Sequence, residues 1–441
     1  MVDKADDSEV EQIVDDLDGV LPDEIDRRRF VDGALGLIGA GMFAGCTGNS
    51  GSGGSAGSDN GSAGSDNGSA GSDNGSNESG GGSTSTSNGN GGGFSDDEEV
   101  VFTTSWKKEP SHGPVHITEL KGYWEDEGLA GIDGVRGNGS DTESLNIGTG
   151  NKEMGYASFA TAISVWPGDE DIEALNMSLM GMAAARPFLS LIWRKDKLED
   201  YTDVAGKDVL LASGFAASTW DMYPALVDVD ASKVNTQEAG EETGPPALAN
   251  NNVQAIWGSV DLLSSYQEEV DAELGVTPIT EFGAIPGLPI WVNNEWYNNK
   301  DNAVEFMAAV LTGYHKALKW CLLNGDAYIK YMQNEVNPNL QTWTEEELYG
   351  QYQSFLATAV NLDYKEERIG YFTQEGVQTG IDGAAAGLLD DPDVVPPASE
   401  IVKREAFEAS EPVTFTDDEW NQVAEGAGAF WGIFKEAESD N

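Results

Sequence analysis

The sequence predicts an α/β fold of two lobes, each with a parallel-rich sheet flanked by helices, followed by a helical C-terminal region. Strand-like apolar runs alternate with helix-like segments from Val100 to Val292, which is typical of parallel sheets covered on both faces. Roughly 340 residues follow position 98, and because one hydrophobic core usually holds fewer, two lobes are expected. From Lys300 onward the apolar spacing is helical.

The expected strands are short apolar runs, rich in β-branched or aromatic residues and bounded by Gly, Pro, Asn or Asp. They are residues 100–104, 152–157, 174–179, 188–193, 207–212, 234–239, 253–257 and 288–292. Helices are expected between them at residues 114–126, 217–226, 245–250 and 261–274.

The second half is expected to be helical at residues 300–322, 326–336, 344–360 and 417–437. Thr344 with Glu347, and Thr416 with Glu419, form the pattern of a capping box at a helix start. Glycines and prolines between positions 376 and 397 predict a loop. We expect this tail to pack on the first lobe.

The N-terminus predicts export and lipid attachment. Arg27 and Arg28 lead into an apolar run that ends at Cys46. The run is shorter than the roughly 20 apolar residues of a membrane-spanning helix, and it has the length of a signal peptide. Residues 1–46 resemble a twin-arginine export signal fused to a lipobox, in which Cys46 receives a lipid. The alternative is a buried apolar helix with an incidental cysteine.

Residues 47–98 predict a flexible tether. They are almost entirely Gly, Ser, Asn, Asp and Thr, and Gly-Ser-Ala-Gly-Ser-Asp-Asn recurs from Gly54, Gly61 and Gly68. Such a segment cannot bury enough apolar surface to offset the entropy lost on ordering. A lipid, a tether and a folded body would together hold the protein at the extracellular face of the cell membrane.

The chain is strongly acidic, with a formal net charge of −53. The acids are spread along the body, for example in residues 125–127 and 417–419. Nucleic acid is excluded as a partner because phosphate binding needs basic patches. A uniformly acidic surface is similar to halophilic adaptation, in which high salt screens the repulsion. A calcium loop is the alternative, but the Asp-x-Asp-x-Asp-Gly pattern is absent.

The residue types needed for a metal site or for catalysis are scarce. The chain has two cysteines and three histidines, too few for a structural zinc site once Cys46 is lipidated. Cys321 lies in a helical run and is expected to be a small buried side chain. The sequence has no Gly-x-Ser-x-Gly, no P-loop and no Ser–His–Asp order. We therefore expect no metal, no cofactor and no enzymatic activity.

Several short segments occur in a recognisable order over roughly residues 100–340. They are Trp106 with Pro110 and His112-Gly113, then Lys121-Gly122-Tyr123-Trp124, Gly155-Tyr156-Ala157-Ser158, Ala205-Gly206-Lys207-Asp208-Val209 and Asn252-Val253-Gln254-Ala255-Ile256-Trp257. Their order resembles that in the nitrate/sulfonate/taurine and thiamine-precursor solute-binding family of ABC importers. Within this family, the chain resembles the haloarchaeal type. The chain departs from thiamine-precursor binders at residues 107–109, where these often have a Pro-Asn pair, and in its long acidic C-terminus.

The resemblance implies a type II periplasmic-binding-protein fold, in which the chain crosses between lobes twice. Lobe 1 would then be residues 99–189 plus 288–441, including the C-terminal helices, and lobe 2 would be residues 190–287. A ligand would bind in the cleft between them and bias an open–closed hinge. The expected partners are a small-molecule ligand and ABC permease and ATPase subunits, and the protein is expected to be a monomer.

Candidate ligand-binding residues fall at strand ends and helix starts of the expected cleft. Ser158, Gly214 and Ser218 would offer hydroxyls or close backbone approach near helix N-termini, although Ser is also favoured there as an ordinary cap. Trp106, Tyr156, Trp220 and Trp257 would form an aromatic wall, with core packing as the alternative. His112 follows the first strand and would face the cleft or solvent. Arg136, Arg186 and Arg194 could hold an anion or pair with surface acids.

The sequence leaves several functions open. The leading one is delivery of a small organic solute or oxyanion to an ABC transporter, the ligand being sulfonate-, nitrate- or taurine-like or a pyrimidine thiamine precursor. The aromatic residues suit the pyrimidine better. One alternative is a membrane-tethered sensor or surface interaction lipoprotein. Another is a pyrimidine-synthesis enzyme on the same fold, which the lack of a cysteine cluster disfavours.

Overall fold

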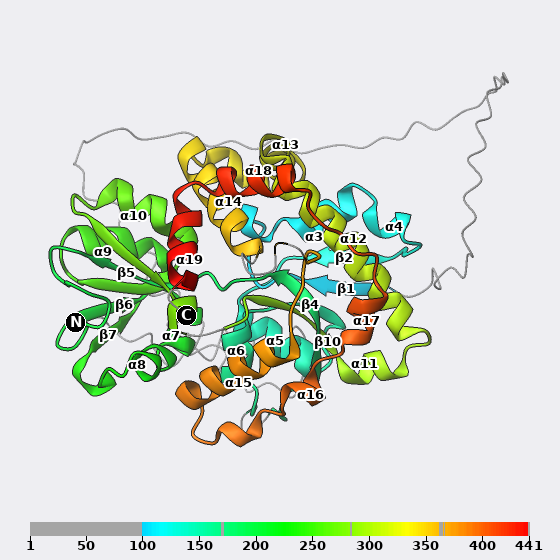
Figure 1. The fold of residues 1–441 in the computed structure, drawn as a ribbon, viewed down its shortest axis with the longest axis horizontal. Coiled ribbons are helices and arrows are strands. Elements are labelled where there is room, and N and C mark those ends of the chain that lie inside the picture. Colours follow the sequence, from blue (N-terminus) through cyan, green and yellow to red (C-terminus); the bar gives the residue numbers. More distant parts are fainter. Residues whose placement is uncertain (1–98, 169–171, 283–284, 361–364, 366, 440–441) are drawn as a thin grey trace, which may run out of the picture. The chain divides into compact units, whose positions relative to one another are not determined.

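The computed structural model describes residues 99–168, 172–282, 285–360, 365 and 367–439, and all that follows concerns these residues. The predicted export signal at Arg27 and Arg28, the lipid site at Cys46 and the tether lie outside this range. The described chain contains two five-stranded sheets, each covered by helices (Figure 1).

The first sheet has the order β2-β1-β3-β10-β4. Its strands are β1 (Val100–Thr103), β2 (Ile132–Val135), β3 (Met154–Tyr156), β4 (Met177–Ala184) and β10 (Leu288–Asn293). Strand β1 runs parallel to β2 and β3, and its Phe102 lies opposite Gly134 and Met154. Strand β10 is antiparallel to β3 and β4, because it enters the sheet from the second lobe.

The second sheet repeats this pattern in the order β7-β6-β8-β5-β9. Its strands are β5 (Leu189–Arg194), β6 (Asp208–Leu211), β7 (Asn235–Glu238), β8 (Ala255–Ser259) and β9 (Leu274–Pro278). Strand β6 is parallel to β7 and β8, whereas β5 is antiparallel to β8 and β9. The predicted two-lobe α/β fold is confirmed, with mixed sheets. Below, lobe 1 means the first sheet with its helices and lobe 2 means the second.

Helices cover both lobes. Those of lobe 1 are α3 (Pro114–Leu120), α4 (Tyr123–Asp126), α5 (Ser140–Gly148), α6 (Phe159–Ser164), α11 (Asn294–Asn299) and α12 (Ala303–Leu323), with the short turn η1 (Pro110–His112). Those of lobe 2 are α7 (Gly214–Thr219), α8 (Met222–Leu226), α9 (Gly244–Ala249) and α10 (Leu263–Glu269), with the turns η3 (Glu241–Thr243) and η4 (Val260–Leu262). The helix expected at 114–126 is divided at Gly122, whose φ of 68° favours glycine.

The C-terminal region is helical, as predicted. It consists of α13 (Gly325–Tyr331), α14 (Glu345–Ala359), α15 (Gln374–Leu388), α16 (Ala398–Ile401), α17 (Arg404–Ala409), α18 (Asp417–Ala427) and α19 (Ala429–Ser439). The capping boxes at Thr344 and Thr416 are both present. The helix predicted at 417–437 is broken at Gly428, which has a φ of 55°.

The prediction of a loop at residues 376–397 is wrong for its first half, because α15 forms there. The glycines of α15 allow close packing against neighbouring elements and do not form turns. A Cβ at Gly380 would overlap Pro286 and approach Phe159 of lobe 1, and one at Gly387 would lie 2.7 Å from the Cα of Met222 in lobe 2. Glycine lets this helix approach both lobes closely.

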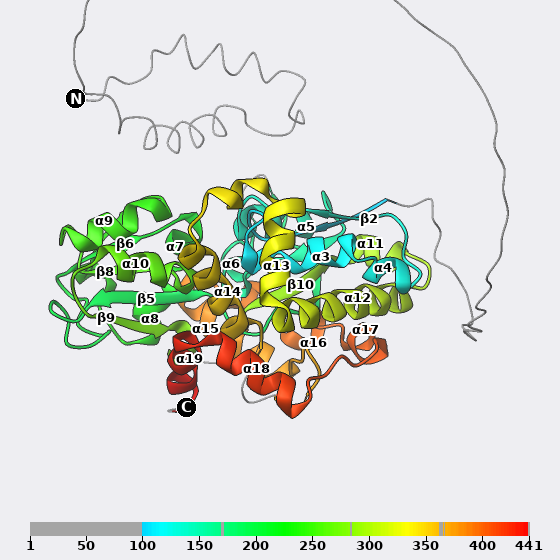
Figure 2. The same cartoon turned by 90° about the horizontal axis from the view of Figure 1, so that it is seen from above.

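Two C-terminal helices contact both lobes and a third contacts lobe 2, whereas the sequence led us to expect this tail on lobe 1. Helix α14 packs against η1 of lobe 1 and against η4 and α10 of lobe 2, and α15 packs against α6 and α8. Helix α19 packs against α14 and β9, and Figures 1 and 2 show it beside lobe 2. The tail therefore bridges the lobes next to the segments that join the sheets.

Candidate functional site

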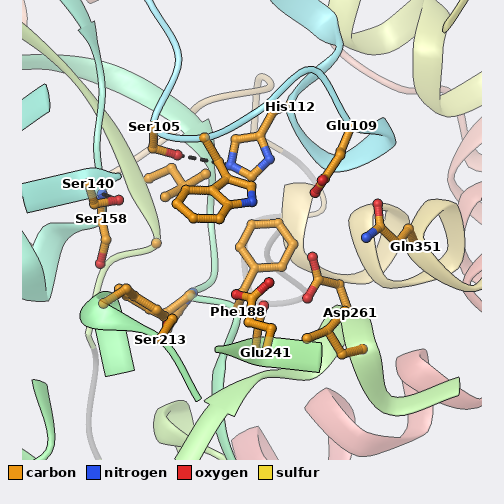
Figure 3. Close-up of a pocket in the computed structure, with 17 residues that line it drawn as sticks. Ser105, Glu109, His112, Ser140, Ser158, Phe188, Ser213, Glu241, Asp261 and Gln351 are labelled. Carbon is orange, nitrogen blue, oxygen red and sulfur yellow. Dashed lines mark hydrogen bonds between the residues drawn. The ribbon is translucent and has the colours of Figure 1, made fainter. Parts of the chain in front are cut away.

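A pocket lies where the loops of the two lobes meet, and it encloses about 660 Å³ of atom-free space that is partly open to solvent (Figure 3). Lobe 1 lines it with Ser105, Trp106, Glu109, His112, Ser140 and Ser158, and lobe 2 with Ser213, Phe215, Glu241, Ser259, Asp261 and Leu262. The joining segments add Pro187, Phe188, Gly287 and Leu288, and α14 adds Gln351. Most of these residues follow the carboxyl ends of β1, β3, β6 and β8, where open α/β sheets usually bind ligands.

Aromatic rings occupy the centre of the pocket. His112 stacks on Phe188 with ring centroids 6.1 Å apart. Its Nε2 lies 2.9 Å from Ser105 Oγ, and its Nδ1 lies 2.8 Å from Ser111 Oγ. Burial lowers the pKa of His112 to about 3, so this ring is neutral at physiological pH. It can stack and hydrogen-bond but cannot neutralise an anion.

Carboxyl groups are the main polar feature of the pocket. Burial, with the nearby charge of Asp261, raises the pKa of Glu109 to about 7, although Lys107 and Gln351 oppose the shift. Burial, with the charges of Asp261 and Glu109, raises the pKa of Glu241 to about 8. Burial also raises the pKa of Asp261, against a hydrogen bond from Ser259. Near neutral pH these groups therefore share fewer negative charges than three free carboxylates would carry.

Among the described residues that line the pocket, none is Lys or Arg. The guanidinium of the buried Arg186 donates to the carbonyl of Ala357 at 2.6 Å and stacks over Phe434. Arg194 bonds Asp196 and two backbone carbonyls of α9, and Arg136 is exposed beside Asn138. The arginines considered for anion binding thus lie outside this pocket.

The structure brings three of the predicted ligand-binding residues together: Trp106, His112 and Ser158 all line the pocket. Tyr156 lies behind them, and its hydroxyl donates to the carbonyl of His112 at 3.1 Å. Gly214 lies between the lining residues Ser213 and Phe215 without lining the pocket itself.

The other predicted residues lie in the framework of lobe 2. The Ser218 hydroxyl donates to the carbonyl of Phe215 within α7. Trp257 is fully buried, donates to Thr219 Oγ1 at 3.3 Å and packs edge-on against Trp220. Trp257 lies inside β8 rather than after it, so its side chain belongs to the core between sheet and helices.

Sequence reasoning missed Glu109, Glu241, Asp261 and Gln351. Asp261 carried a usable signal, because it follows a predicted strand by a few residues. Glu241 lies in a Glu-Glu pair that resembles the acidic surface elsewhere in the chain. Gln351 lies inside a predicted helix, and only the packing of α14 brings it to the pocket.

Two further findings limit the chemistry of the described part of the chain. Within it, no group of three or more His, Cys, Asp or Glu side chains is arranged to hold a metal ion. The helices of this part are also all too short or too polar to cross a bilayer.

Two mixed sheets joined by two crossing segments, with a pocket between them, define the class of two-lobe, periplasmic-binding-protein-like folds. Solved structures confirm the class at low sequence identity. A protein from Bordetella bronchiseptica RB50 is 15% identical with a TM-score of 0.51, covering 71% of this chain and 97% of its own. The periplasmic nitrate-binding protein NrtA from Synechocystis PCC 6803 is 11% identical with a TM-score of 0.50, covering 75% and 90%. The periplasmic sulfonate-binding protein SsuA from Methylobacillus flagellatus KT is 12% identical with a TM-score of 0.50, covering 74% and 100%.

The sequence itself matches a family. The family model described as NMT1/THI5 like covers residues 109–320. The resemblance predicted from the short segments between Trp106 and Trp257 is therefore confirmed over this range.

Two curated relatives correct one expectation. Both are named 4-amino-5-hydroxymethyl-2-methylpyrimidine phosphate synthase. The protein from Schizosaccharomyces pombe is 23% identical over 39% of this chain and 47% of its own length. The protein from Aspergillus parasiticus is 26% identical over 25% and 32%. The matches thus span less than half of these relatives. The expectation that this chain is no enzyme is contradicted, because the curated proteins that it resembles are named as enzymes.

Proposed function

We propose that this protein captures a small planar nitrogen heterocycle of the pyrimidine class in the pocket between its lobes. The observation that carries this proposal is the composition of the pocket. Aromatic rings stand at its centre, and three carboxyls line it without any Lys or Arg among the described lining residues. Trp106, Phe188 and Phe215 offer faces for stacking on a flat ring, and Ser158 offers a hydroxyl.

An inorganic oxyanion or a sulfonate fits this pocket poorly. Such ligands are usually held by arginine or by several N–H donors, whereas Glu109, Glu241 and Asp261 would repel them. Between the ligand classes that the sequence left open, the pocket therefore favours the pyrimidine. The pyrimidine in the names of the two curated relatives supports the same choice.

The proposal includes delivery of this solute to an ABC permease and ATPase, by a protein held at the extracellular face of the membrane through a lipid on Cys46. The fold shared with periplasmic binding proteins supports this role. A Cys46→Ala variant tests the anchor. It should move from the membrane fraction to the medium, whereas retention at the membrane would contradict lipid attachment at this residue.

Calorimetry of the full-length chain in high salt tests the ligand class. The probes are 4-amino-5-hydroxymethyl-2-methylpyrimidine, taurine and nitrate. We expect heat only with the pyrimidine, and a stabilisation of about 2.7 kcal/mol at a hundredfold excess over the dissociation constant. Heat with taurine or nitrate alone would contradict the ligand class, and heat with none of the three would contradict the proposal.

A catalytic role in pyrimidine synthesis is the second candidate, favoured by the names of the two curated relatives. Glu109 and Glu241 have pKa values raised to about 7 and 8, and carboxyls in that range suit general acid–base chemistry. Expression in cells that lack their own pyrimidine synthase tests it. Growth without added pyrimidine would support catalysis, because binding alone cannot supply the missing compound.

A further inference from the structure

One side of the pocket carries a cluster of hydrogen-bond acceptors. Figure 3 shows Glu109, Asp261 and Gln351 together on one side, with Glu241 below them, while Ser140, Ser158 and Ser213 lie opposite. We call the side chains of Glu109, Glu241, Asp261 and Gln351 the carboxyl wall. The wall combines residues from lobe 1, lobe 2 and the bridging helix α14.

Two acceptors of this wall have no partner among the described residues. Gln351 is only 5% exposed, and its Oε1 is buried without a hydrogen bond. The side chain of Gln351 is hydrogen-bonded to Glu109, which leaves the carbonyl oxygen as the free acceptor. The Oδ1 atom of Asp261 is likewise buried without a partner. Buried polar atoms are nearly always paired in native proteins, so these two acceptors are available to the donor groups of a ligand.

The part of the chain that the structure describes supplies no such donor. The positive charge of Lys107 lowers the pKa of Glu109. This side chain is exposed, extends over the Trp106 ring and does not line the pocket. A metal ion is not favoured either, because the described residues offer no ligand set for one. An organic group with two or more N–H donors would satisfy both acceptors.

We propose that the carboxyl wall recognises the basic edge of an aminopyrimidine, formed by a ring nitrogen and the adjacent exocyclic amino group. A carboxylate can accept two parallel N–H bonds from such an edge when the ring nitrogen is protonated. Asp261, whose Oδ1 has no partner among the described residues, takes this pair, and the Gln351 carbonyl accepts the remaining amino hydrogen. Trp106 and Phe188 then cover the faces of the ring. The inference rests on the proposed function and names the group that the pocket selects.

This recognition also links the lobes. Glu109 precedes η1 of lobe 1, Asp261 belongs to η4 of lobe 2, and α14 packs against both turns. A ligand bonded to Asp261 of lobe 2 and stacked on Trp106 of lobe 1 holds the lobes together, whereas a ring without donors can only stack. Selection and closure thus depend on the same atoms.

The test compares two probes of the same shape on the full-length chain. 4-Amino-2-methylpyrimidine carries the basic edge, and 2,4-dimethylpyrimidine replaces the amino group by a methyl group. We expect calorimetry to show the amino compound binding at least about tenfold tighter, since a site built for a polar group rejects the analogue that lacks it. Glu109→Gln and Asp261→Asn should each reduce that preference to about threefold or less.

Glu242→Gln is the matched control, because Glu242 is exposed next to Glu241 and does not line the pocket. It should keep the wild-type preference. Equal binding of both probes by the wild type would overturn the carboxyl-wall proposal and leave the proposed function standing. A preference that persists in Glu109→Gln and in Asp261→Asn, with cooperative unfolding retained, would also overturn it. Binding of neither probe by a folded chain would overturn both proposals.

Discussion

The loop after β1 in lobe 1 and strand β8 in lobe 2 each carry a tryptophan near the carboxyl end of a strand, but only one of these side chains lines the pocket. Trp106 lies three residues beyond the end of β1, is half-buried and lines the pocket. Trp257 lies within β8 and is fully buried against Trp220 and Tyr223. In this protein the tryptophan beyond the last residue of its strand lines the pocket, and the tryptophan within its strand lies in the core.

The carboxyl groups of the pocket come mainly from lobe 2. Lobe 1 supplies Glu109 from the same loop as Trp106 and His112, so one segment carries both stacking and polar groups. Lobe 2 supplies Asp261 and Glu241 from two turns that follow β8 and β7. The aromatic surface therefore belongs mainly to lobe 1 and the joining segments, and two of the three carboxyls belong to lobe 2. A ligand must contact both lobes to use both properties.

Removing Trp257 should have the largest effect, on stability. Trp257→Ala leaves a cavity in the core of lobe 2, and losses of about 3–5 kcal/mol are usual for a buried tryptophan. The free energy of unfolding from chemical denaturation measures this loss. Trp106→Ala is the comparison and should cost much less stability, because its side chain is only half-buried. Equal losses for the two variants would contradict the division between core and site.

Substitutions in α15 test how much both lobes depend on the bridging helix. Gly380→Ala places a methyl group against Pro286 and Phe159, and Gly387→Ala places one against the backbone of Met222. Overpacking of this kind costs about 1–3 kcal/mol. Gly383→Ala is the control in the same helix, since its Cβ meets only Ile285 at 3.5 Å and Leu226 at 4.0 Å. That variant should be neutral or slightly more stable, because alanine favours the helix. Denaturation midpoints decide between these outcomes.

Trp106→Ala should weaken binding of the pyrimidine by about tenfold, because an aromatic contact adds roughly 0.5–1.5 kcal/mol beyond burial. Trp106→Phe should lose less, since the phenyl ring still stacks. Calorimetry with the wild type and both variants measures the effect. An unchanged dissociation constant in Trp106→Ala would remove this residue from the site.

The smallest expected effect is on the pH dependence of stability. Glu109 has its pKa raised to about 7 in the folded protein, above its ordinary 4.5, so the folded state binds more protons between these values. Its contribution to stability therefore falls as the pH rises from about 4.5 to about 7. Glu109→Gln removes this loss and should raise the melting temperature by roughly 2 °C at pH 8 relative to wild type, with little change at pH 4.5.

The neighbours of Glu109 limit the size of that effect. Asp261 raises the pKa of Glu109, while Lys107 lowers it, and Glu241 titrates in the same range. Glu242→Gln, on the exposed surface, should show no difference between the two pH values. A shift in Glu109→Gln that is largest at pH 4.5 would contradict the raised pKa.

The periodicity of the chain was enough to predict most of the framework. The strands β1, β6, β8 and β10 lie where apolar runs bounded by turn residues placed them, because strand formation follows local pattern and side-chain shape. The capping boxes at Thr344 and Thr416 are also local and were read correctly. Two strands went unrecognised: β2 is short and contains Gly134, and β9 follows an apolar spacing that suggested a helix up to Leu274.

The candidate site was less accessible from the sequence. Trp106, His112 and Ser158 could be proposed because each follows a strand end or begins a helix, positions that the fold class directs toward the cleft. Whether the next residue along a strand points to the cleft or to the core is a matter of register. The sequence alone therefore could not show that Trp106 lines the pocket whereas Trp257 lies in the core.

By itself, the sequence determined the alternation of strands and helices, the two-lobe class and the excess of acidic residues, since these depend on composition and on short-range periodicity. Only the tertiary structure decided that glycine-rich α15 is a helix wedged between the lobes, that Gln351 reaches the pocket, and that acids from separate segments form one wall. These features depend on contacts between residues far apart in the chain, where burial and mutual repulsion act on groups that look like ordinary surface acids in the sequence.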